Sequence, residues 1–423
     1  MPFTRSLFAG ALSLIAASAL AADPAPRGKP EDVGMSSARL ALIATAVNAE
    51  IARDQLPGAV LAVVRRGKLV YFEAFGYRDK AAGAPMTTDA IFNIASMTKP
   101  NAAVAGLQMY EQGKLLMDEP LSRYFPQFAR TQVAVMDAKR ETIVSRVPVN
   151  RQITIQDLYR HTSGMIYGGR GATAVHKMFP EGSSQASLAS TGAEFLDALA
   201  DTTLLWQPGS TWDYGFGLDV LGLAVEQASG LRLSEYLQRN VWDPLGMADT
   251  HFVVPADKIG RYAKALPIDP ETKRPQSMRM LTAPAKFDCG GGCMASTASD
   301  YMRFALMLMN KGSYGGQRIL SRKTVEFMTS NQLSADVKSL LVNGDPTRAD
   351  YGFGLSVAVR TTPGIVRMMG SAGDFSWPGA SGTNWWADPK EELAVVWMAH
   401  SPGSIRWKYR QMINALVYQA LVD

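Results

Sequence analysis

The N-terminal part of the chain alternates apolar and polar positions in a way that predicts a helix followed by a β-hairpin. Apolar residues recur at helical spacing between residues 36 and 54, and Ser36 or Ser37 is placed to cap the start of that helix. Two apolar runs, 59–64 and 69–74, then flank a polar turn, which is typical of a hairpin. We expect this end of the chain to form a helix packed on a sheet.

The middle of the chain has a mainly helical pattern, and the C-terminal part returns to strands. Helical periodicity begins near residues 94, 155, 217, 233 and 299. A polar hairpin at 132–149 and a Gly-, Ser- and Thr-rich loop at 163–187 interrupt the helices, and a loop of that length could act as a lid. Strands are expected at 354–359, 366–369, 385–387 and 393–399, before a final helix over 404–421.

These elements predict an α/β (α+β) fold in which one antiparallel sheet, flanked by helices, is built from both ends of the chain. We expect an α/β domain of residues 22–95 plus 345–423. A mostly helical domain of residues 96–344 would be inserted between these two segments. A functional site is expected in a pocket where the two domains meet.

Composition and charge narrow the class of partner. The chain has 423 residues, of which 47% are hydrophobic and 19% charged, as in an ordinary globular protein. Its formal net charge of +5 is small for this length, and no basic run is interleaved with aromatic residues. We therefore expect a small-molecule substrate and no binding to nucleic acid.

The first residues have the pattern of a secretory leader. Arg5 precedes an apolar stretch at 7–20, and Ala19 and Ala21 fit a small-x-small cleavage site, so residues 1–21 are predicted to be a signal peptide. The alternative is a retained anchor, but the apolar stretch is shorter than the ~20 residues that span a bilayer. We expect an exported protein, periplasmic or secreted, with no stable membrane insertion after cleavage.

The two cysteines, Cys289 and Cys293, are separated only by three glycines. In an exported protein they could form a small disulfide loop, and two buried free thiols are the alternative. A zinc site would need about four ligands, and the nearest histidine in sequence, His251, is far away. We expect neither a metal site nor an organic cofactor.

Candidate chemistry begins at the Ser-x-x-Lys tetrad formed by residues 96–99. The tetrad opens a predicted helix, and residues three apart share a helix face, so Lys99 can reach the Ser96 hydroxyl. The helix N-terminus favours a developing alkoxide, and a nearby lysine can help to remove the serine proton. The alternative is an N-cap serine followed by a surface lysine. The chain has no Gly-x-Ser-x-Gly motif that would offer another nucleophile.

Two further motifs contain residues suited to acyl transfer. Tyr214 lies on a predicted turn before a helix, where its phenol could reach a cleft and act as a base beside a lysine. In Trp377-Pro378-Gly379-Ala380, the glycine would let a substrate approach the backbone. The Ala380 N–H and the Ser96 N–H could then form an oxyanion hole. Taken alone, Tyr214 could be a packing aromatic, and the Trp-Pro-Gly stretch a turn with a buried Trp.

The order and spacing of the three motifs resemble the serine β-lactamase and penicillin-binding-protein superfamily, and most closely its class C branch. Within that branch the chain resembles a family VIII carboxylesterase over nearly all of the mature chain. Further matching stretches lie at 161–164, 207–214, 243–247 and 290–301. The resemblance implies a β-lactamase-like fold in which Ser96 is acylated, Lys99 assists its activation and Tyr214 acts as base and then as proton donor. It also implies a structural role for His161.

Two departures from the class C pattern concern the substrate. Phe216 stands where the lactamases have an Asn, and Trp377 stands where they have a Lys, whereas Gly379 matches their Gly. We assign Trp377, Gly379 and Phe216 to substrate binding. Their apolar character favours esters with uncharged, short-chain acyl groups over anionic lactams. The sequence therefore predicts a carboxylesterase-type serine hydrolase.

Two other functions stay open at this point. The first is an amide-cleaving relative: a weak β-lactamase, a D-amino-acid peptidase or an oligoamide hydrolase. The second is an inactive penicillin-binding-like protein that binds a ligand without turnover. The presence of Ser96, Lys99 and Tyr214 together argues against an inactive protein. The pattern does not distinguish whether Lys99 or Tyr214 is the resting base.

Overall fold

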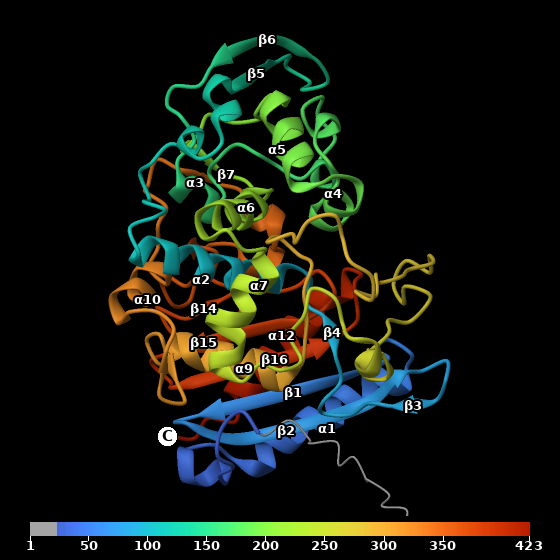
Figure 1. The fold of residues 1–423 in the computed structure, drawn as a ribbon. Coiled ribbons are helices and arrows are strands. Elements are labelled where there is room, and N and C mark those ends of the chain that lie inside the picture. Colours follow the sequence, from blue (N-terminus) through green and yellow to red (C-terminus); the bar gives the residue numbers. More distant parts are fainter. Residues whose placement is uncertain (1–22) are drawn as a thin grey trace, which may run out of the picture.

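The computed structural model describes residues 23–423, and its largest element is an eight-stranded antiparallel sheet in the order β12-β13-β14-β15-β16-β1-β2-β3 (Figure 1). The strands are β1 (Gly58–Arg65), β2 (Lys68–Asp79), β3 (Ala84–Pro85), β12 (Gly352–Phe353), β13 (Ala358–Val359), β14 (Phe375–Ser376), β15 (Asn384–Asp388) and β16 (Leu393–Ala399). The two ends of the chain meet where β1 pairs with β16, with Val63 opposite Val395. The predicted fold class, with a sheet drawn from both chain ends, is confirmed.

Helices cover both faces of this sheet. Successive side chains of a strand point to opposite faces, so Leu61 and Val63 pack on one side and Ala62 and Val64 on the other. The first side is covered by α1 (Ser37–Ala52) and α12 (Ile405–Tyr418), and the second by α9 (Ala298–Met309). Every residue of β1 is buried, which explains its continuous apolar sequence.

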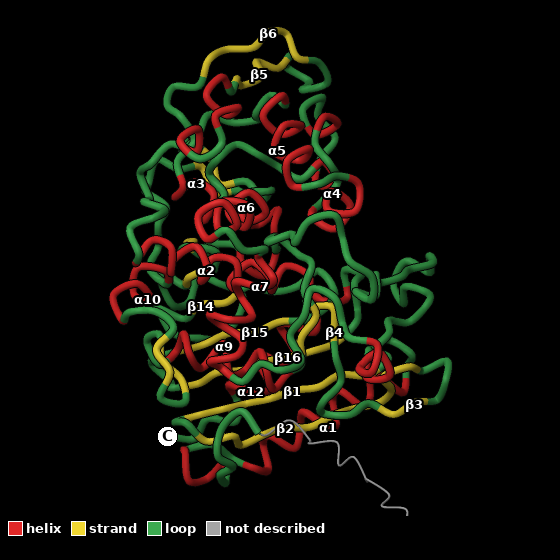
Figure 2. Tube along the Cα trace, viewed as in Figure 1, coloured by secondary structure: helices red, strands yellow, loops and turns green. Residues whose placement is uncertain are grey.

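The segment between the two halves of the sheet is mostly helical and lies above the sheet in Figures 1 and 2. Besides α9, which packs on the sheet, its α-helices are α2 (Thr98–Glu111), α3 (Ile155–Tyr159), α4 (Ser183–Ala189), α5 (Gly192–Asp201), α6 (Gly217–Ser229), α7 (Leu233–Leu237), α8 (Asp243–Leu245), α10 (Arg322–Met328) and α11 (Leu341–Gly344). The predicted hairpin is formed by β5 (Gln132–Met136) and β6 (Ile143–Pro148). Short strands also pair β4 (Phe92–Asn93) with β8 (Ala295–Ser296), and β7 (Thr211–Trp212) with β11 (Lys338–Ser339).

One hydrophobic core contains residues of both the sheet and the inserted helices. It includes Val60 of β1, Leu107 of α2 and Leu221 of α6. The core therefore does not mark a boundary between two domains. The division of the chain at residues 96 and 345 stays a prediction. The signal peptide predicted over residues 1–21 lies outside the described residues. Between residues 23 and 423, no helix is both long and apolar enough to cross a bilayer.

The strand predicted at 366–369 was wrong. Its backbone groups bond to side chains rather than to a neighbouring strand: Met369 N donates to Asn414 Oδ1 at 2.9 Å, and Arg360 donates to the carbonyls of Met368 and Met369. The strand that lies between β13 and β15 in the sheet is instead β14. Apolar periodicity cannot reveal this exchange, because it does not show that Asn414, far along the chain in α12, is brought to the segment by the tertiary fold.

Candidate active site

Ser96 lies in a short 3-10 helix (Ala95–Met97) directly before α2. The turn is tightly held: Ala95 has a left-handed φ of 43°, and its N–H donates to Asn93 Oδ1 at 2.9 Å. A non-glycine residue in that region is uncommon and often marks a functional turn. Ser96 is partly exposed, whereas Lys99, one turn later, is 1% exposed. The nucleophile candidate is thus open to solvent while its partner lysine is buried.

Lys99 is held by two hydrogen bonds from its ammonium group. Nζ donates to the Gly291 carbonyl at 2.6 Å and to Tyr167 Oη at 3.0 Å. It also lies 4.4 Å from the ring centroid of Tyr214. These two bonds leave Nζ able to make a further hydrogen bond, to Ser96 or to Tyr214.

A buried carboxylate completes the surroundings of Lys99. Asp219, at the start of α6, accepts from Ser183 Oγ at 2.8 Å, from Gly291 N at 2.9 Å and from Tyr167 Oη at 3.3 Å. Burial raises the pKa of Asp219 above its usual value, while the charge of Lys99 and the donated hydrogen bonds oppose that rise. Burial also raises the pKa of Tyr167 well above its usual value, so its phenol stays protonated. The network therefore runs from Lys99 through Tyr167 to Asp219.

Tyr214 follows β7 and precedes α6, as the sequence predicts for a residue on a turn. Its Oη accepts a hydrogen bond of 3.1 Å from Trp377 Nε1, and the two rings lie 5.3 Å apart. Among the described residues, Ser96 Oγ has no hydrogen bond to Lys99 or Tyr214; such bonds often tighten only when substrate is bound. Lys99, Tyr214 and Trp377 are nonetheless brought together beside the Ser96 helix.

The third motif lies against the Ser96 turn. A side chain at Gly379 would overlap the carbonyl oxygen of Ile94, two residues before Ser96, and Thr383 Oγ1 donates to the same carbonyl at 3.3 Å. Ala380 is exposed, and its N–H has no acceptor among residues 23–423. A free N–H at this position is what an oxyanion hole needs.

Two further aromatic side chains pack beside the site. Phe216 is fully buried, and its ring packs edge-on against that of Tyr167 with 4.5 Å between the centroids, so its assignment to substrate binding stays a prediction. His161 packs 4.7 Å from the Tyr214 ring, and burial lowers its pKa well below the usual value, with the charges of Lys99 and Arg170 adding to the effect. A neutral His161 in this aromatic cluster fits the structural role that the resemblance implies.

Sequence reasoning missed Tyr167, Ser183 and Asp219. The first two lie in the segment 163–187, which was predicted to be one long loop; this is wrong at its end, because α4 begins at Ser183. Tyr167 and Ser183 both join the Lys99 network, and a role of the segment as a lid stays a prediction. Asp219 had a detectable signal, since it is a lone acid within the apolar run 217–225, and a buried carboxylate needs partners.

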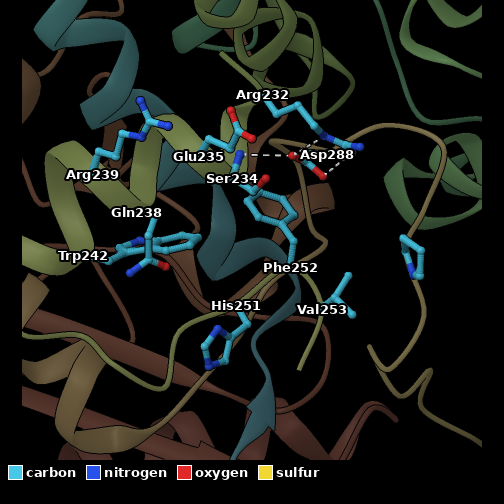
Figure 3. Close-up of a pocket in the computed structure, with 11 residues that line it drawn as sticks. Arg232, Ser234, Glu235, Gln238, Arg239, Trp242, His251, Phe252, Val253 and Asp288 are labelled. Atoms are coloured by element: carbon cyan, nitrogen blue, oxygen red, sulfur yellow. Dashed lines mark hydrogen bonds and ion pairs between the residues drawn. The ribbon is translucent and has the colours of Figure 1, made fainter. Parts of the chain in front are cut away.

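A separate cavity of about 450 Å³ contains none of these residues. Figure 3 shows it between α7 and the segment around His251, where the Arg232 side chain and the Ser234 backbone N–H bond to Asp288. Within the described part of the chain, no group of three or more His, Cys, Asp or Glu side chains is arranged to hold a metal ion. The site expected at Ser96 is therefore separate from this cavity.

Comparison with known proteins identifies the family. The family model for Beta-lactamase matches residues 43–417. The chain belongs to the beta-lactamase family. Esterase EstB from Burkholderia gladioli is 30% identical over 397 residues, covering 88% of this chain and 93% of EstB. Protein Rv1367c from Mycobacterium tuberculosis (strain ATCC 25618 / H37Rv) is 36% identical over 354 residues, covering 82% of this chain and 86% of that protein.

A solved structure supports the same fold. EstCE1, described as a hydrolase with promiscuous acyltransferase activity, superposes with a TM-score of 0.75 at 24% identity, covering 90% of this chain and 99% of EstCE1. The resemblance to the family VIII esterase type of the beta-lactamase family, inferred from the motifs, is therefore confirmed.

In this member of the beta-lactamase family a disulfide closes the glycine loop that holds Lys99. Cys289 pairs with Cys293, which resolves the alternative left open by the sequence. Gly291, at the centre of the loop, binds Lys99 through its carbonyl and Asp219 through its N–H. The disulfide thus braces the backbone that places the lysine.

Replacing both cysteines by alanine is therefore expected to affect both stability and turnover. The free energy of unfolding should fall by about 2 kcal/mol, because a small loop is no longer closed in the unfolded chain. We expect kcat for an ester to fall about tenfold, or about 1.4 kcal/mol, since the Gly291 carbonyl is less well held. Denaturant titration and initial rates measure the two effects. Dithiothreitol should lower the rate of the wild type but not of the variant, and unchanged kcat in the variant would contradict the bracing role.

Proposed function

We propose that this protein hydrolyses short-chain carboxylic esters through an acyl-enzyme formed on Ser96. The chain is an esterase-type hydrolase of the beta-lactamase family, and its relatives support serine hydrolysis and acyl transfer as the general chemistry. The single observation that carries the finer proposal is the meeting of Lys99, Tyr214 and Trp377 beside the 3-10 helix that contains Ser96.

The proposed reaction has two steps. Ser96 Oγ attacks the ester carbonyl carbon while its proton passes to the Lys99–Tyr214 pair. The N–H groups of Ser96 and Ala380 stabilise the oxyanion of the tetrahedral intermediate. When the C–O bond to the alcohol breaks, Tyr214 returns the proton to the leaving alkoxide. Water then attacks the acyl-enzyme with Tyr214 as base, releasing the acid and restoring Ser96.

The proposed substrate preference rests on the surroundings of Trp377. Its indole N–H is already donated to Tyr214, so it offers a substrate carboxylate no cation and no free donor. A carboxylate left unpaired against apolar surface is costly. Besides Lys99, the Arg170 guanidinium lies nearby, 5.2 Å from the Tyr214 ring centroid, but it donates to the Asn343 and Gly344 carbonyls.

We expect esters to be turned over far faster than β-lactams. The specificity constant kcat/KM for p-nitrophenyl butyrate should exceed that for nitrocefin by at least about a hundredfold, or about 2.7 kcal/mol. Rates across acyl chains should be highest at about two to six carbons. The Arg170→Gln variant is the matched test of the nearby cation: because this guanidinium is occupied by backbone carbonyls, its loss should leave nitrocefin turnover unchanged.

A ratio near one, or one that favours nitrocefin, would assign the protein to amide hydrolysis instead. No turnover of either substrate by folded protein would favour a ligand-binding protein. We also propose export on the basis of the leader pattern, which N-terminal sequencing of the mature protein tests: the first residue should be Ala22.

A further inference from the structure

The carbonyl of the peptide between Gly379 and Ala380 accepts a hydrogen bond from a buried arginine. Arg410 of α12 donates from Nη2 to the Gly379 carbonyl at 2.9 Å, and its side chain is 3% exposed. We propose that Arg410 is a positioning residue that aims the Ala380 N–H at the oxyanion. This inference rests on the proposed function, since it concerns the same oxyanion hole.

The geometry of the peptide connects Arg410 to the direction of the Ala380 N–H. A trans peptide is planar, and its C=O and N–H point in opposite directions. Anchoring the Gly379 carbonyl toward α12 therefore turns the Ala380 N–H away from α12, on the exposed side of the chain. The same carbonyl also accepts from Gly382 N at 3.3 Å, so two donors oppose rotation of the peptide.

Asp345 holds the arginine in turn. Arg410 Nη1 lies 3.1 Å from Asp345 Oδ1, and the Asp345 side chain is 2% exposed. Asp345 is itself fixed by Thr347, which donates from its backbone N at 3.1 Å and from Oγ1 at 2.8 Å. Burial lowers the pKa of Arg410 to about 10, and the charge of Asp345 opposes that fall, so the guanidinium is a cation at neutral pH.

A buried cation on the carbonyl side also strengthens the donor on the other side. Electrostatic interactions are stronger in a low-dielectric interior, and hydrogen bonds in a chain polarise one another. The chain here runs from Arg410 through the Gly379 carbonyl to the Ala380 N–H. Its effect grows when negative charge develops on the substrate oxygen, so it should appear in kcat more than in KM.

The test compares Arg410→Gln and Arg410→Lys with a control on the same helix. Lys408→Gln removes a cation of α12 that pairs with Glu50 and does not contact Gly379, so it should leave the kinetics unchanged. For p-nitrophenyl butyrate, Arg410→Gln should lower kcat about tenfold or more with KM within about twofold. Arg410→Lys should recover part of the loss. Affinity for an alkylboronic acid, which becomes tetrahedral on the serine, should fall by the same factor as kcat.

A double-mutant cycle separates positioning from general support of the fold. Ala380→Pro removes the N–H itself, so Arg410→Gln should cost nothing further in that background. Additive losses would overturn the inference, as would unchanged kcat and boronate affinity in a folded Arg410→Gln protein. If Arg410→Gln does not fold, Asp345→Asn keeps the arginine but loosens it. This variant should lower kcat by less than Arg410→Gln would. An unchanged kcat in folded Asp345→Asn would also overturn the inference.

Failure of the proposed function would look different. In that case a serine-reactive phosphonate would not label Ser96, and Ser96→Ala would retain ester turnover. Labelling of Ser96 together with unaffected boronate binding in Arg410→Gln would leave the proposed function standing and reject only the role of Arg410.

Discussion

Replacing Ser96 by alanine is expected to lower kcat for p-nitrophenyl butyrate by at least about a thousandfold, because the acyl-enzyme can no longer form. The substitution removes one oxygen from a partly exposed side chain at a helix start, so the fold should be retained. Initial rates and thermal unfolding measure the two quantities. Ser122→Ala, in a short 3-10 helix (Leu121–Arg123), is a matched control and should keep full activity.

Covalent labelling tests the assignment of Ser96 as the nucleophile without measuring turnover. A serine-reactive phosphonate should add once to the chain, and peptide mass mapping should place it on Ser96. The Ser96→Ala protein should not react. Labelling of a different serine, with Ser96→Ala still active, would reject the assignment of the nucleophile.

Loss of either Lys99 or Tyr214 is expected to cost about as much as loss of the serine. Tyr214→Phe removes only the phenolic oxygen, which accepts from Trp377 Nε1, and leaves the ring beside Lys99 in place. Lys99→Met removes the ammonium at similar volume. Each should lower kcat by about a thousandfold or more, because in the proposed mechanism proton removal from the serine and proton return to the alcohol both depend on the pair.

Groups that act as a unit are not additive, so the double variant Lys99→Met/Tyr214→Phe should be no slower than the worse single variant. Tyr236→Phe in α7 removes a buried phenol outside the site and serves as the control. If Tyr214→Phe kept more than about a tenth of the wild-type rate, another group would have to be the base.

The predictable parts of the fold are those in which local pattern and packing agree. Helix α1 begins at Ser37 with Ser36 as its cap, as the periodicity indicates, and β1 and β2 form the expected hairpin. Burial selects apolar residues at the spacing of the element itself, so these elements can be predicted without knowing what they pack against. The strand expected at 366–369 failed because side chains supply its hydrogen bonds: those of Arg360, a few residues earlier, and of Asn414, which is distant in sequence.

In the candidate site, too, some contacts follow from local structure and others do not. Ser96 and Lys99 are three residues apart on one helical turn, so their proximity follows from helix geometry alone. The contacts of Tyr214 with Lys99 and Trp377 join residues more than a hundred positions apart, and only the resemblance to a known family pointed to them.

The sequence by itself thus determined the local elements, the family-typical motifs and the residue types able to perform acyl transfer. The tertiary structure alone decided what surrounds them: the Tyr167–Asp219 network on Lys99, the glycine loop closed by the Cys289–Cys293 disulfide, and the arginine behind Gly379. The physical reason is that a buried polar group needs a partner but does not specify where in the chain the partner lies. Only folding brings that partner within hydrogen-bond distance.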